Sequence, residues 1–294
     1  MLRLTGITKS YGGRRVLDDV SFDVTPGRLT GFVGGNGAGK TTTMRVILGV
    51  LAADSGSVTL DGAPVTAEQR TDFGYMPEER GLYSKMPVLE LIVYLGRLHG
   101  MSQAEARSSA ESLLDKLGLG ERLTDTVESL SLGNQQRAQI AAALVHNPEV
   151  LVLDEPFSGL DPIAVEVVLN VLKDYASGGA PVLFSSHQLD IVERLCDDLV
   201  VIADGQIRAS GSREGIREAH SSPRFELQLD GDAGWLRSEP GVEVIDFAGG
   251  YALFDVDDLA TSQRVLQRAI ATAPVQRFGP KYPTLAQIFT EVIQ

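Results

Sequence analysis

The sequence predicts an α/β domain built on parallel strands, followed by a small α+β domain. In residues 1–220, short apolar runs of strand length alternate with helical patterns, as in buried parallel strands that are joined by helices. A stretch at about 82–147 has helical spacing almost throughout, which predicts a helical subdomain inserted into the α/β domain. Beyond residue 220, alternating strand patterns predominate.

The spacing of apolar residues predicts the elements of the first domain. Strands are expected where these residues alternate or run without interruption, and helices where they recur every three or four positions. The turn pair Asp61–Gly62 marks the end of a strand, and Gly118 the end of a helix. In chain order we expect strands at 16–24 and 29–33, a helix at 40–48, a strand at 56–62, helices within 88–147, a strand at 150–153, a helix at 163–175, and strands at 182–184 and 199–203.

The second domain is expected at 221–294, where the composition changes. Its pattern reads β-β-β-α-β-α, for which a ferredoxin-like arrangement is one candidate. Two of its strands, at 242–247 and 251–256, flank a pair of glycines as in a hairpin. Thr284 and Gln287 form a capping box at the start of the last helix, whose apolar residues recur at helical spacing.

The overall composition excludes several classes of protein. The chain has 294 residues, of which 43% are hydrophobic and 22% charged, and this is enough to bury a full core. Its net charge of −13 argues against a non-specific nucleic-acid binder, which needs a basic surface. The single cysteine, Cys196, permits no internal disulfide and is interpreted as a packing residue. No signal peptide is expected, and no apolar run approaches the roughly 20 residues that span a bilayer.

A phosphate-binding loop is predicted where the strand at 29–33 leads into the helix at 40–48. The sequence there matches G-x-x-x-x-G-K-[ST], and a preceding strand and following helix are the context in which this pattern binds phosphate. Its glycines let successive N–H groups surround phosphate oxygens, and the start of the helix adds positive potential. Lys40 would contact the β and γ phosphates, and Thr41 would ligate Mg²⁺. The predicted nucleotide-binding residues of the loop are Gly34, Gly35, Asn36, Gly37, Ala38, Gly39, Lys40, Thr41 and Thr42.

Two more strand ends supply candidates for the same site, because ligands of parallel sheets bind beyond the carboxyl ends of the strands. The strand at 150–153 ends in Asp154 and Glu155. We expect Asp154 to hold Mg²⁺ through water and Glu155 to polarise the attacking water as general base. The strand at 182–184 leads to His187, whose imidazole can donate a hydrogen bond to the γ-phosphate.

The order of these motifs resembles that of the ABC transporter ATP-binding proteins. Residues 130–137, Leu-Ser-Leu-Gly-Asn-Gln-Gln-Arg, are similar to the family's signature, LSGGQ, and stand shortly before the acidic strand. Residues 158–161 resemble the family's D-loop, and His187 its switch histidine. Tyr11 stands where the family places an aromatic residue that stacks on adenine. The motifs cover roughly the first five-sixths of the chain.

The resemblance implies an ABC-type P-loop NTPase core with an antiparallel β-subdomain and the inserted helical subdomain. It also implies an ATPase that uses ATP and Mg²⁺ and powers solute transport, by analogy export, through a separate integral membrane permease. Such a subunit is cytoplasmic and peripheral on the inner face of the cell membrane.

The signature also implies a second ATP-binding subunit. Ser131 and Gly133 lie at a predicted helix start and would offer a second anion site. In the family, this end of one copy closes over the ATP bound to another in a head-to-tail dimer. We therefore expect a homodimer, and no nucleic-acid partner.

Two positions depart from the family pattern. In the signature, Leu132 and Asn134 replace glycine and glutamine, whereas the serine and the second glycine are retained. In the segment similar to the family's Q-loop, Glu78 stands where glutamine is usual. Its carboxylate either ligates Mg²⁺ directly or slows the reaction, because it adds negative charge near the phosphates. The run Pro-Glu-Glu-Arg-Gly-Leu-Tyr at 77–83 is similar to that of the sodium- and drug-exporting branch of the family.

Two alternatives remain open. An ABC ATPase that acts on nucleic acid or the ribosome, without transport, would carry the same motifs, but the single phosphate loop, the lack of a heptad run and the acidic charge disfavour it. The domain at 221–294 is either a regulatory or dimer-contact module, or a packing domain that stabilises the dimer, and the packing role is favoured because it contains no constellation of titratable residues.

Overall fold

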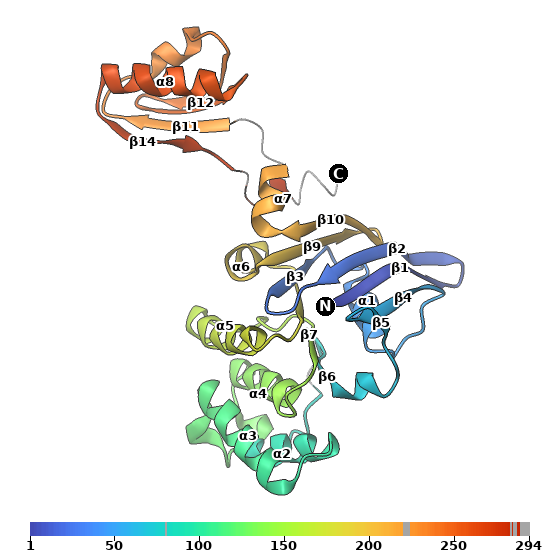
Figure 1. Cartoon of the computed structure of the whole chain (residues 1–294). Coiled ribbons are helices and arrows are strands. Elements are labelled where there is room, and N and C mark those ends of the chain that lie inside the picture. Colours follow the sequence, from blue (N-terminus) through green and yellow to red (C-terminus); the bar gives the residue numbers. More distant parts are fainter. Residues whose placement is uncertain (80, 220–223, 283, 285–286, 289–294) are drawn as a thin grey trace. The chain divides into compact units, whose positions relative to one another are not determined.

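The computed structural model describes the chain except for residues 80, 220–223, 283, 285–286 and 289–294 (Figure 1). The chain divides into two compact units, one formed by Met1–Arg213 and the other by Glu214–Glu291. The domain boundary that we expect between residues 220 and 221 lies outside the described residues. Each unit has its own hydrophobic core.

The first unit is built around a six-stranded sheet in the order β10-β9-β3-β8-β7-β6. Its strands are parallel except for β10, which pairs antiparallel with β9. Every residue of β3, β7 and β8 is buried, which explains why these strands form uninterrupted apolar runs in the sequence. The strands are β3 (Leu29–Val33), β6 (Phe73–Met76), β7 (Val150–Leu153), β8 (Val182–Ser186), β9 (Asp198–Ala203) and β10 (Gln206–Ser212).

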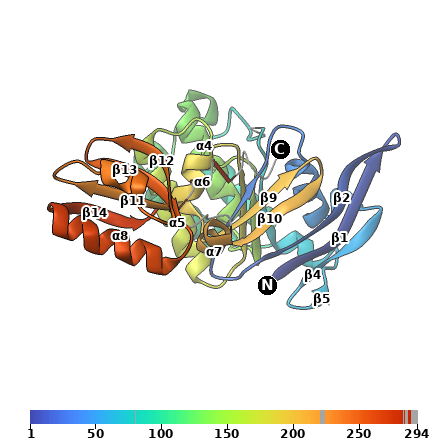
Figure 2. The ribbon, with the colours of Figure 1, turned by 90° about the horizontal axis from the view of Figure 1, so that it is seen from above.

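A four-stranded antiparallel sheet, in the order β2-β1-β4-β5, completes the β-structure of this unit (Figure 2). It shares one hydrophobic core with the six-stranded sheet, and helix α1 (Lys40–Ile47) contributes Met44 and Ile47 to that core. The rings of Phe22 and Phe32, one from each sheet, have centroids 5.2 Å apart. The strands are β1 (Leu2–Tyr11), β2 (Arg14–Val24), β4 (Ser55–Leu60) and β5 (Ala63–Pro64).

The segment between β6 and β7 forms the helical subdomain that the sequence predicts. Its helices α2 (Val88–Leu98), α3 (Gln103–Lys116) and α4 (Leu132–Leu144) contact one another (Figure 1). Helix α3 begins with a capping box, in which the Ser102 hydroxyl and the Glu105 carboxylate each accept a hydrogen bond from the other's backbone N–H. The 3₁₀ turns η2 (Gly120–Arg122) and η3 (Val127–Ser129) lead from α3 to α4.

Further helices complete the first unit. Helices α5 (Pro162–Ser177) and α6 (Leu189–Leu195) contact β3, and α6 also contacts β8, so both pack against the six-stranded sheet. The 3₁₀ turn η1 (Gln69–Asp72) precedes β6. Helix α7 (Arg213–Ala219) follows β10 in the chain and, except for its first residue, falls in the second unit.

The expected strands at 29–33 and 150–153 are confirmed to the residue, and most other expected elements end within two residues of their observed ends. Among the strands of the first unit, the sequence analysis misses β1, β5, β6 and β10. Register shifts interrupt the pairing of β1 with β2, which weakens its alternation. Both β6 and β10 lie at the edges of the sheet, and β10 has no fully buried residue, so its apolar pattern is weak.

The second unit is an antiparallel sheet in the order β12-β13-β11-β14, with helix α8 packed against it. This order, with α8 joining β13 to β14, is the ferredoxin-like arrangement, except that the short 3₁₀ helix η4 stands in place of the first α-helix. The expected hairpin is confirmed by the antiparallel pairing of β12 with β13. The elements are β11 (Arg224–Leu229), η4 (Gly234–Ser238), β12 (Val242–Ala248), β13 (Tyr251–Val256), α8 (Leu259–Thr272) and β14 (Val275–Pro280).

The capping box expected near the C-terminus is present. The Thr284 backbone N–H donates to Gln287 Oε1 at 2.8 Å, and the Gln287 N–H donates to Thr284 Oγ1 at 3.3 Å. Most of the helix expected to follow lies outside the described residues.

The core of the second unit can be tested separately, because the only tryptophan of the chain, Trp235, lies in it. Phe254 is fully buried, and its ring lies 6.3 Å from that of Phe225 and 6.5 Å from that of Phe278. We expect Phe254→Ala to destabilise this unit by about 3–5 kcal/mol, because it leaves a cavity in the core. Urea unfolding of the full chain, followed by tryptophan fluorescence, measures the change.

The matched control for Phe254→Ala is Ile245→Ala on the same sheet, since the Ile245 side chain is 46% exposed. This substitution should change the free energy of unfolding by no more than about 0.5 kcal/mol. Equal effects of the two substitutions would contradict the assignment of Phe254 to the core.

Candidate functional site

A cavity of about 500 Å³ lies at the carboxyl ends of the parallel strands of the first unit. Four strand ends that are distant in the sequence contribute to it: the glycine-rich loop after β3, the segment after β6, the acidic pair after β7 and the histidine after β8. This edge of a parallel sheet is where ligands bind. The cavity is lined by Val16, Gly35, Asn36, Gly37, Gly39, Lys40, Thr41, Thr42, Glu78, Asp154, Glu155 and His187.

The glycine-rich loop wraps the start of helix α1. Gly39 is the N-cap residue of α1 and has a φ of 111°, which side-chain-bearing residues rarely adopt. Lys40 is 9% exposed, and its ammonium group donates to the carbonyl oxygens of Gly34 at 2.6 Å and Gly35 at 3.3 Å. A Cβ at Gly34 would lie 2.5 Å from the carbonyl oxygen of Ile202, so only glycine fits there. The loop therefore holds a cation at the start of a helix, which suits an anionic ligand.

Asp154 is the most buried charged group of the site, with 1% of its surface exposed. Thr41 Oγ1 donates to its Oδ2 at 2.9 Å, and Ser185 Oγ donates to its Oδ1 at 2.5 Å. These bonds tie β7 to helix α1 on one side and to β8 on the other. The pKa of the nearby Tyr75 hydroxyl is raised, first by burial and then by the negative charge of Asp154.

Glu155 has an unusual backbone conformation and a histidine partner. Its φ of 53° lies in the left-handed region, which costs a residue with a side chain roughly 1–3 kcal/mol. The Ser185 hydroxyl accepts a hydrogen bond from the Glu155 N–H at 2.9 Å, and the Gln136 side chain donates to its carbonyl oxygen at 2.9 Å. Its side-chain Oε1 lies 3.0 Å from His187 Nδ1. The carboxylate is therefore held at the cavity wall by its backbone and by the imidazole.

The sequence analysis misses three polar residues that support the site. Ser185 hydrogen-bonds both Asp154 and the backbone of Glu155, and Gln136 and Gln139 of α4 donate to the backbone next to the acidic residues. Ser185 precedes His187 by two residues on a strand that leads into the site, and this position was its only signal in the sequence. The glutamines have no such signal, because their partners are carbonyl groups that are distant in the sequence.

Five predicted nucleotide-binding residues are not among those that line this cavity: Gly34 and Ala38, which belong to the loop itself, and Tyr11, Ser131 and Gly133. Tyr11 is at the end of β1 and 50% exposed, and the Lys9 ammonium lies 5.7 Å from the centre of its ring. Ser131 is the exposed N-cap residue of α4, and its hydroxyl accepts a hydrogen bond from the Asn134 N–H at 3.3 Å. Gly133 lies in the first turn of the same helix. Ser131 and Gly133 thus form a separate anion-binding candidate, distinct from the phosphate loop of the same chain.

The oxygen atoms of the site suit Mg²⁺. Among the described residues, no three His, Cys, Asp or Glu side chains are grouped closely enough to hold a metal by themselves. Mg²⁺ is usually bound through one or two carboxylates together with phosphate oxygens and water. The Thr41 hydroxyl and the Asp154 carboxylate, which lie together at the cavity wall, match that preference, and Glu78 adds a second carboxylate nearby.

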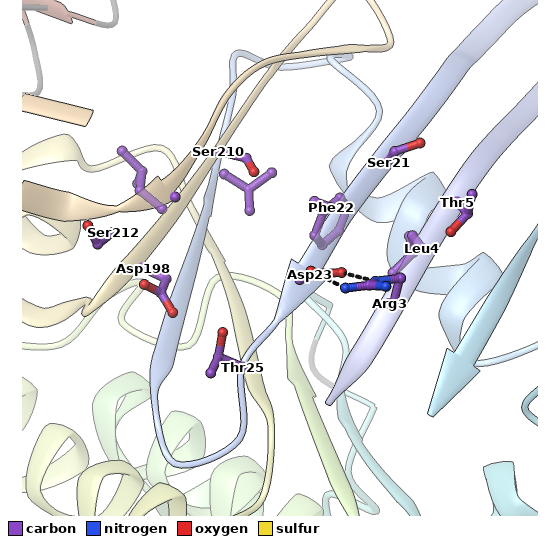
Figure 3. A pocket seen from close by; sticks show the side chains of 13 residues that line it. Arg3, Leu4, Thr5, Ser21, Phe22, Asp23, Thr25, Asp198, Ser210 and Ser212 are labelled. Atoms are coloured by element: carbon purple, nitrogen blue, oxygen red, sulfur yellow. Dashed lines mark hydrogen bonds and ion pairs between the residues drawn. The ribbon is translucent and has the colours of Figure 1, made fainter. Parts of the chain in front are cut away.

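A second cavity of about 540 Å³ lies between β1 and β2 on one side and β9 and β10 on the other (Figure 3). Its charged side chains are already paired. Arg3 donates to both carboxylate oxygens of Asp23, at 2.6 and 2.8 Å. Asp198 accepts two hydrogen bonds from Arg28, at 2.8 and 2.9 Å. None of the residues predicted to act on a nucleotide lies there.

Models of known protein families match residues in both units. A model of the ABC transporter ATP-binding domain matches residues 17–158, and a model described as the C-terminal domain of DrrA1-3-like ATP-binding proteins matches residues 211–293. Within the described residues, no helix has both the length and the apolar composition needed to cross a bilayer.

Several curated proteins are similar over most of their length. The chain is 36% identical over 294 residues to the uncharacterized ABC transporter ATP-binding protein YhaQ of Bacillus subtilis (strain 168), covering all of this chain and 98% of that protein. It is 38% identical to the Nod factor export ATP-binding protein I of Paraburkholderia xenovorans (strain LB400), covering 86% of this chain and 78% of that protein. It is 36% identical to the linearmycin resistance ATP-binding protein LnrL of Bacillus subtilis (strain 168), covering 74% and 70%.

Solved structures of ABC transporter ATP-binding subunits are also similar to this chain. A structure of the ATP-binding subunit of an ABC transporter superposes with a TM-score of 0.69 at 32% sequence identity, over 74% of this chain and 92% of that one. A nucleotide-free ATP-binding cassette from an ABC transporter superposes with a TM-score of 0.66 at 29% identity, over 76% and 96%. With a phosphate loop, an acidic strand end and a histidine around one cavity, and with these relatives, the chain belongs to the ATP-binding proteins of ABC transporters.

Proposed function

We propose that this chain hydrolyses ATP and thereby powers solute transport through a separate membrane permease. The observation that carries this proposal is the meeting of Lys40, Asp154 and Glu155 at one cavity, where a cation for phosphate, a buried metal ligand and a candidate base lie together. A phosphate-binding loop alone would support only nucleotide binding. The acidic residues beside it supply what hydrolysis needs in addition.

Binding of the triphosphate falls to the loop and the start of α1. The backbone N–H groups of the loop and the partial positive charge of the helix N-terminus face the phosphates, and Lys40 exchanges its carbonyl partners for phosphate oxygens. Thr41 and Asp154 would hold Mg²⁺, and Glu78, which also lines the cavity, would supply a second carboxylate. When bound, Mg²⁺ neutralises charge on the β and γ phosphates.

Activation of the attacking water falls to Glu155. Its carboxylate accepts a hydrogen bond from the water and takes its proton as the water oxygen bonds to the γ-phosphorus and the bond from that phosphorus to the departing oxygen of ADP breaks. A His187 ring with its proton on Nδ1 would donate to Glu155 Oε1, which lies 3.0 Å away, and orient the carboxylate. A neutral ring with its proton on Nε2 would donate to the γ-phosphate instead, and its Nδ1 would then have to turn away from Glu155, because both atoms would be acceptors.

Two copies of the chain are needed to complete each site. Ser131 and Gly133 lie at the start of α4 and outside the cavity, so within one chain they cannot cap the nucleotide held by the loop. In a head-to-tail homodimer, this end of α4 in one copy closes over the ATP held by the other, and Tyr11 contacts the adenine. The nucleotide then joins the subunits, and its hydrolysis lets them separate.

The membrane partner and the direction of transport are inferred from the relatives. The names of two similar proteins refer to Nod factor export and to linearmycin resistance, which favours export here. The chain would then act on the cytoplasmic side, peripheral to its permease. We assign residues 1–220 to the ATP-binding domain and residues 221–294 to a packing domain that supports the dimer. No observation favours action on nucleic acid or the ribosome, and the net charge of −13 disfavours it.

Glu155→Gln should abolish hydrolysis while leaving ATP binding intact, since an amide cannot take the proton from water. We expect the rate constant kcat to fall by about 10²–10⁴-fold and the ATP-bound dimer to accumulate. Phosphate release and size-exclusion chromatography with ATP and Mg²⁺ measure the two effects. Glu166→Gln is the control, because Glu166 is exposed and pairs with Arg194 on the surface. Retained turnover in the Glu155 variant would remove it as the base.

Lys40→Ala should weaken ATP binding, because it removes a charged donor to phosphate. A loss of about 10–100-fold in affinity is expected for one charge-assisted hydrogen-bonding group. Equilibrium binding of a fluorescent ATP analogue measures the change, and Lys173→Ala, on the exposed surface of α5, is the control. An unchanged dissociation constant would contradict the assignment of the loop.

Glu78→Gln tests whether the carboxylate at this position binds metal. If Glu78 contributes to the Mg²⁺ site, the Mg²⁺ concentration for half-maximal hydrolysis should rise by about tenfold at saturating ATP. Glu79→Gln is the neighbouring control, because Glu79 does not line the cavity. A faster reaction at unchanged Mg²⁺ dependence would show instead that the carboxylate slows the reaction through its charge.

A further inference from the structure

Helix α4 joins two functional regions of the chain. Its N-terminus, capped by Ser131, is the end that would close over the ATP of a second copy. Further along, it carries Gln136 and Gln139, which are three residues apart and therefore lie on one face of the helix. Both side chains are buried, with 2% and 3% of their surface exposed. A buried amide on a helix is held by specific partners, and the partners of these two are Glu155, which lines the cavity, and residues next to Glu155 or Glu78 in the chain.

The two amides hold the backbone segments that carry Glu155 and Glu78. Gln136 Nε2 donates to the carbonyl oxygens of Glu155, at 2.9 Å, and of Pro156, at 3.1 Å. Gln139 Nε2 donates to the carbonyl oxygens of Pro77, at 2.8 Å, and of Glu79, at 3.3 Å, on either side of Glu78. One helix face thus connects to the ends of β7 and β6, and both acidic residues line the cavity.

Packing of the core does not by itself explain these glutamines. Among the described residues, the buried Oε1 of Gln139 has no hydrogen-bond partner, and a buried acceptor without a partner is destabilising. An apolar side chain of similar length would avoid this. The Gln136 bond also holds Glu155 in the left-handed conformation, with φ of 53°. Both amides therefore fit a role in fixing where the acidic side chains stand.

We propose that Gln136 and Gln139 are positioning residues that make α4 a connector between the two ATP sites of the dimer. When Ser131 engages the nucleotide on the partner, α4 is fixed, and through the two amides it sets the backbone of Glu155 and Glu78 in its own site. Occupation of one site thereby prepares the other for hydrolysis. This inference rests on the proposed head-to-tail ATPase and adds the residues that couple its two sites.

The first test separates positioning from stability. Gln136→Met should lower kcat by about tenfold with unchanged ATP affinity, and Gln139→Met should raise the Mg²⁺ concentration for half-maximal hydrolysis by about tenfold. Gln135→Met is the matched control: it also removes two amide-to-carbonyl bonds of α4, but these go to Val127 and Leu130, within the helical subdomain. It should lower the melting temperature comparably and leave the Mg²⁺ dependence unchanged. If all three variants change only the melting temperature, the glutamines are merely structural and the proposal fails.

The second test isolates the coupling in mixed dimers of full-length chains that carry different affinity tags. One protomer carries Glu155→Gln, so only the site of the other hydrolyses ATP. In the proposed dimer, Ser131 of the hydrolysing protomer contacts the ATP bound at the inactive site. Ser131→Ala in this protomer can therefore affect the active site only through helix α4 of the same protomer. We expect it to lower the rate by about tenfold, and by less than twofold when the same protomer also carries Gln136→Met and Gln139→Met.

Weakened dimerisation affects both measurements equally, so it cancels in the comparison. A full tenfold loss in the glutamine variants as well, or no loss from Ser131→Ala in either background, would overturn the connector. These outcomes differ from a failure of the proposed function, in which the wild-type chain neither binds ATP nor associates in its presence.

Discussion

The hydrogen bond from Thr41 to Asp154 is the interaction on which the candidate site depends. Asp154 is 1% exposed, and a buried carboxylate without donors would destabilise the fold by several kcal/mol. Its donors are two hydroxyls, Thr41 from α1 and Ser185 from β8, so the charge is satisfied only while these elements keep their places. The parallel register of β3, β7 and β8 sets those places. The same contacts that stabilise the sheet therefore assemble the phosphate loop and the acidic pair into one cavity.

Glu155 illustrates how such a site can keep a strained residue. Its left-handed backbone would relax if it were free, yet both of its peptide groups are engaged: the N–H by Ser185 and the carbonyl by Gln136. These partners come from β8 and α4, which lie in different layers of the unit. Strain of this kind persists where surrounding structure determines the conformation completely, and it keeps the carboxylate directed at the cavity.

The division between the helical subdomain and the sheet has a functional consequence. The cavity lies at the strand ends, whereas Ser131 is exposed at the start of α4. Four amide-to-carbonyl hydrogen bonds from Gln136 and Gln139 connect that helix to the strand ends. Helix α4 is therefore attached both to the helical subdomain and to the sheet. The ferredoxin-like unit has a separate core around Phe254.

Local patterns in the sequence were enough to predict the buried strands, the phosphate loop, the acidic pair and His187, because each depends on consecutive residues or on a strand end. The same patterns predicted the family. They could not predict Ser185, Gln136 or Gln139 as supports of the site, because these side chains bond to groups 19 to 62 residues away along the chain. They also missed β10, whose edge position leaves its residues partly exposed. Periodicity and motif spacing therefore determined which elements and which reactive residues this chain has, whereas only the tertiary structure, through register and packing, decided which polar side chains hold those residues in position.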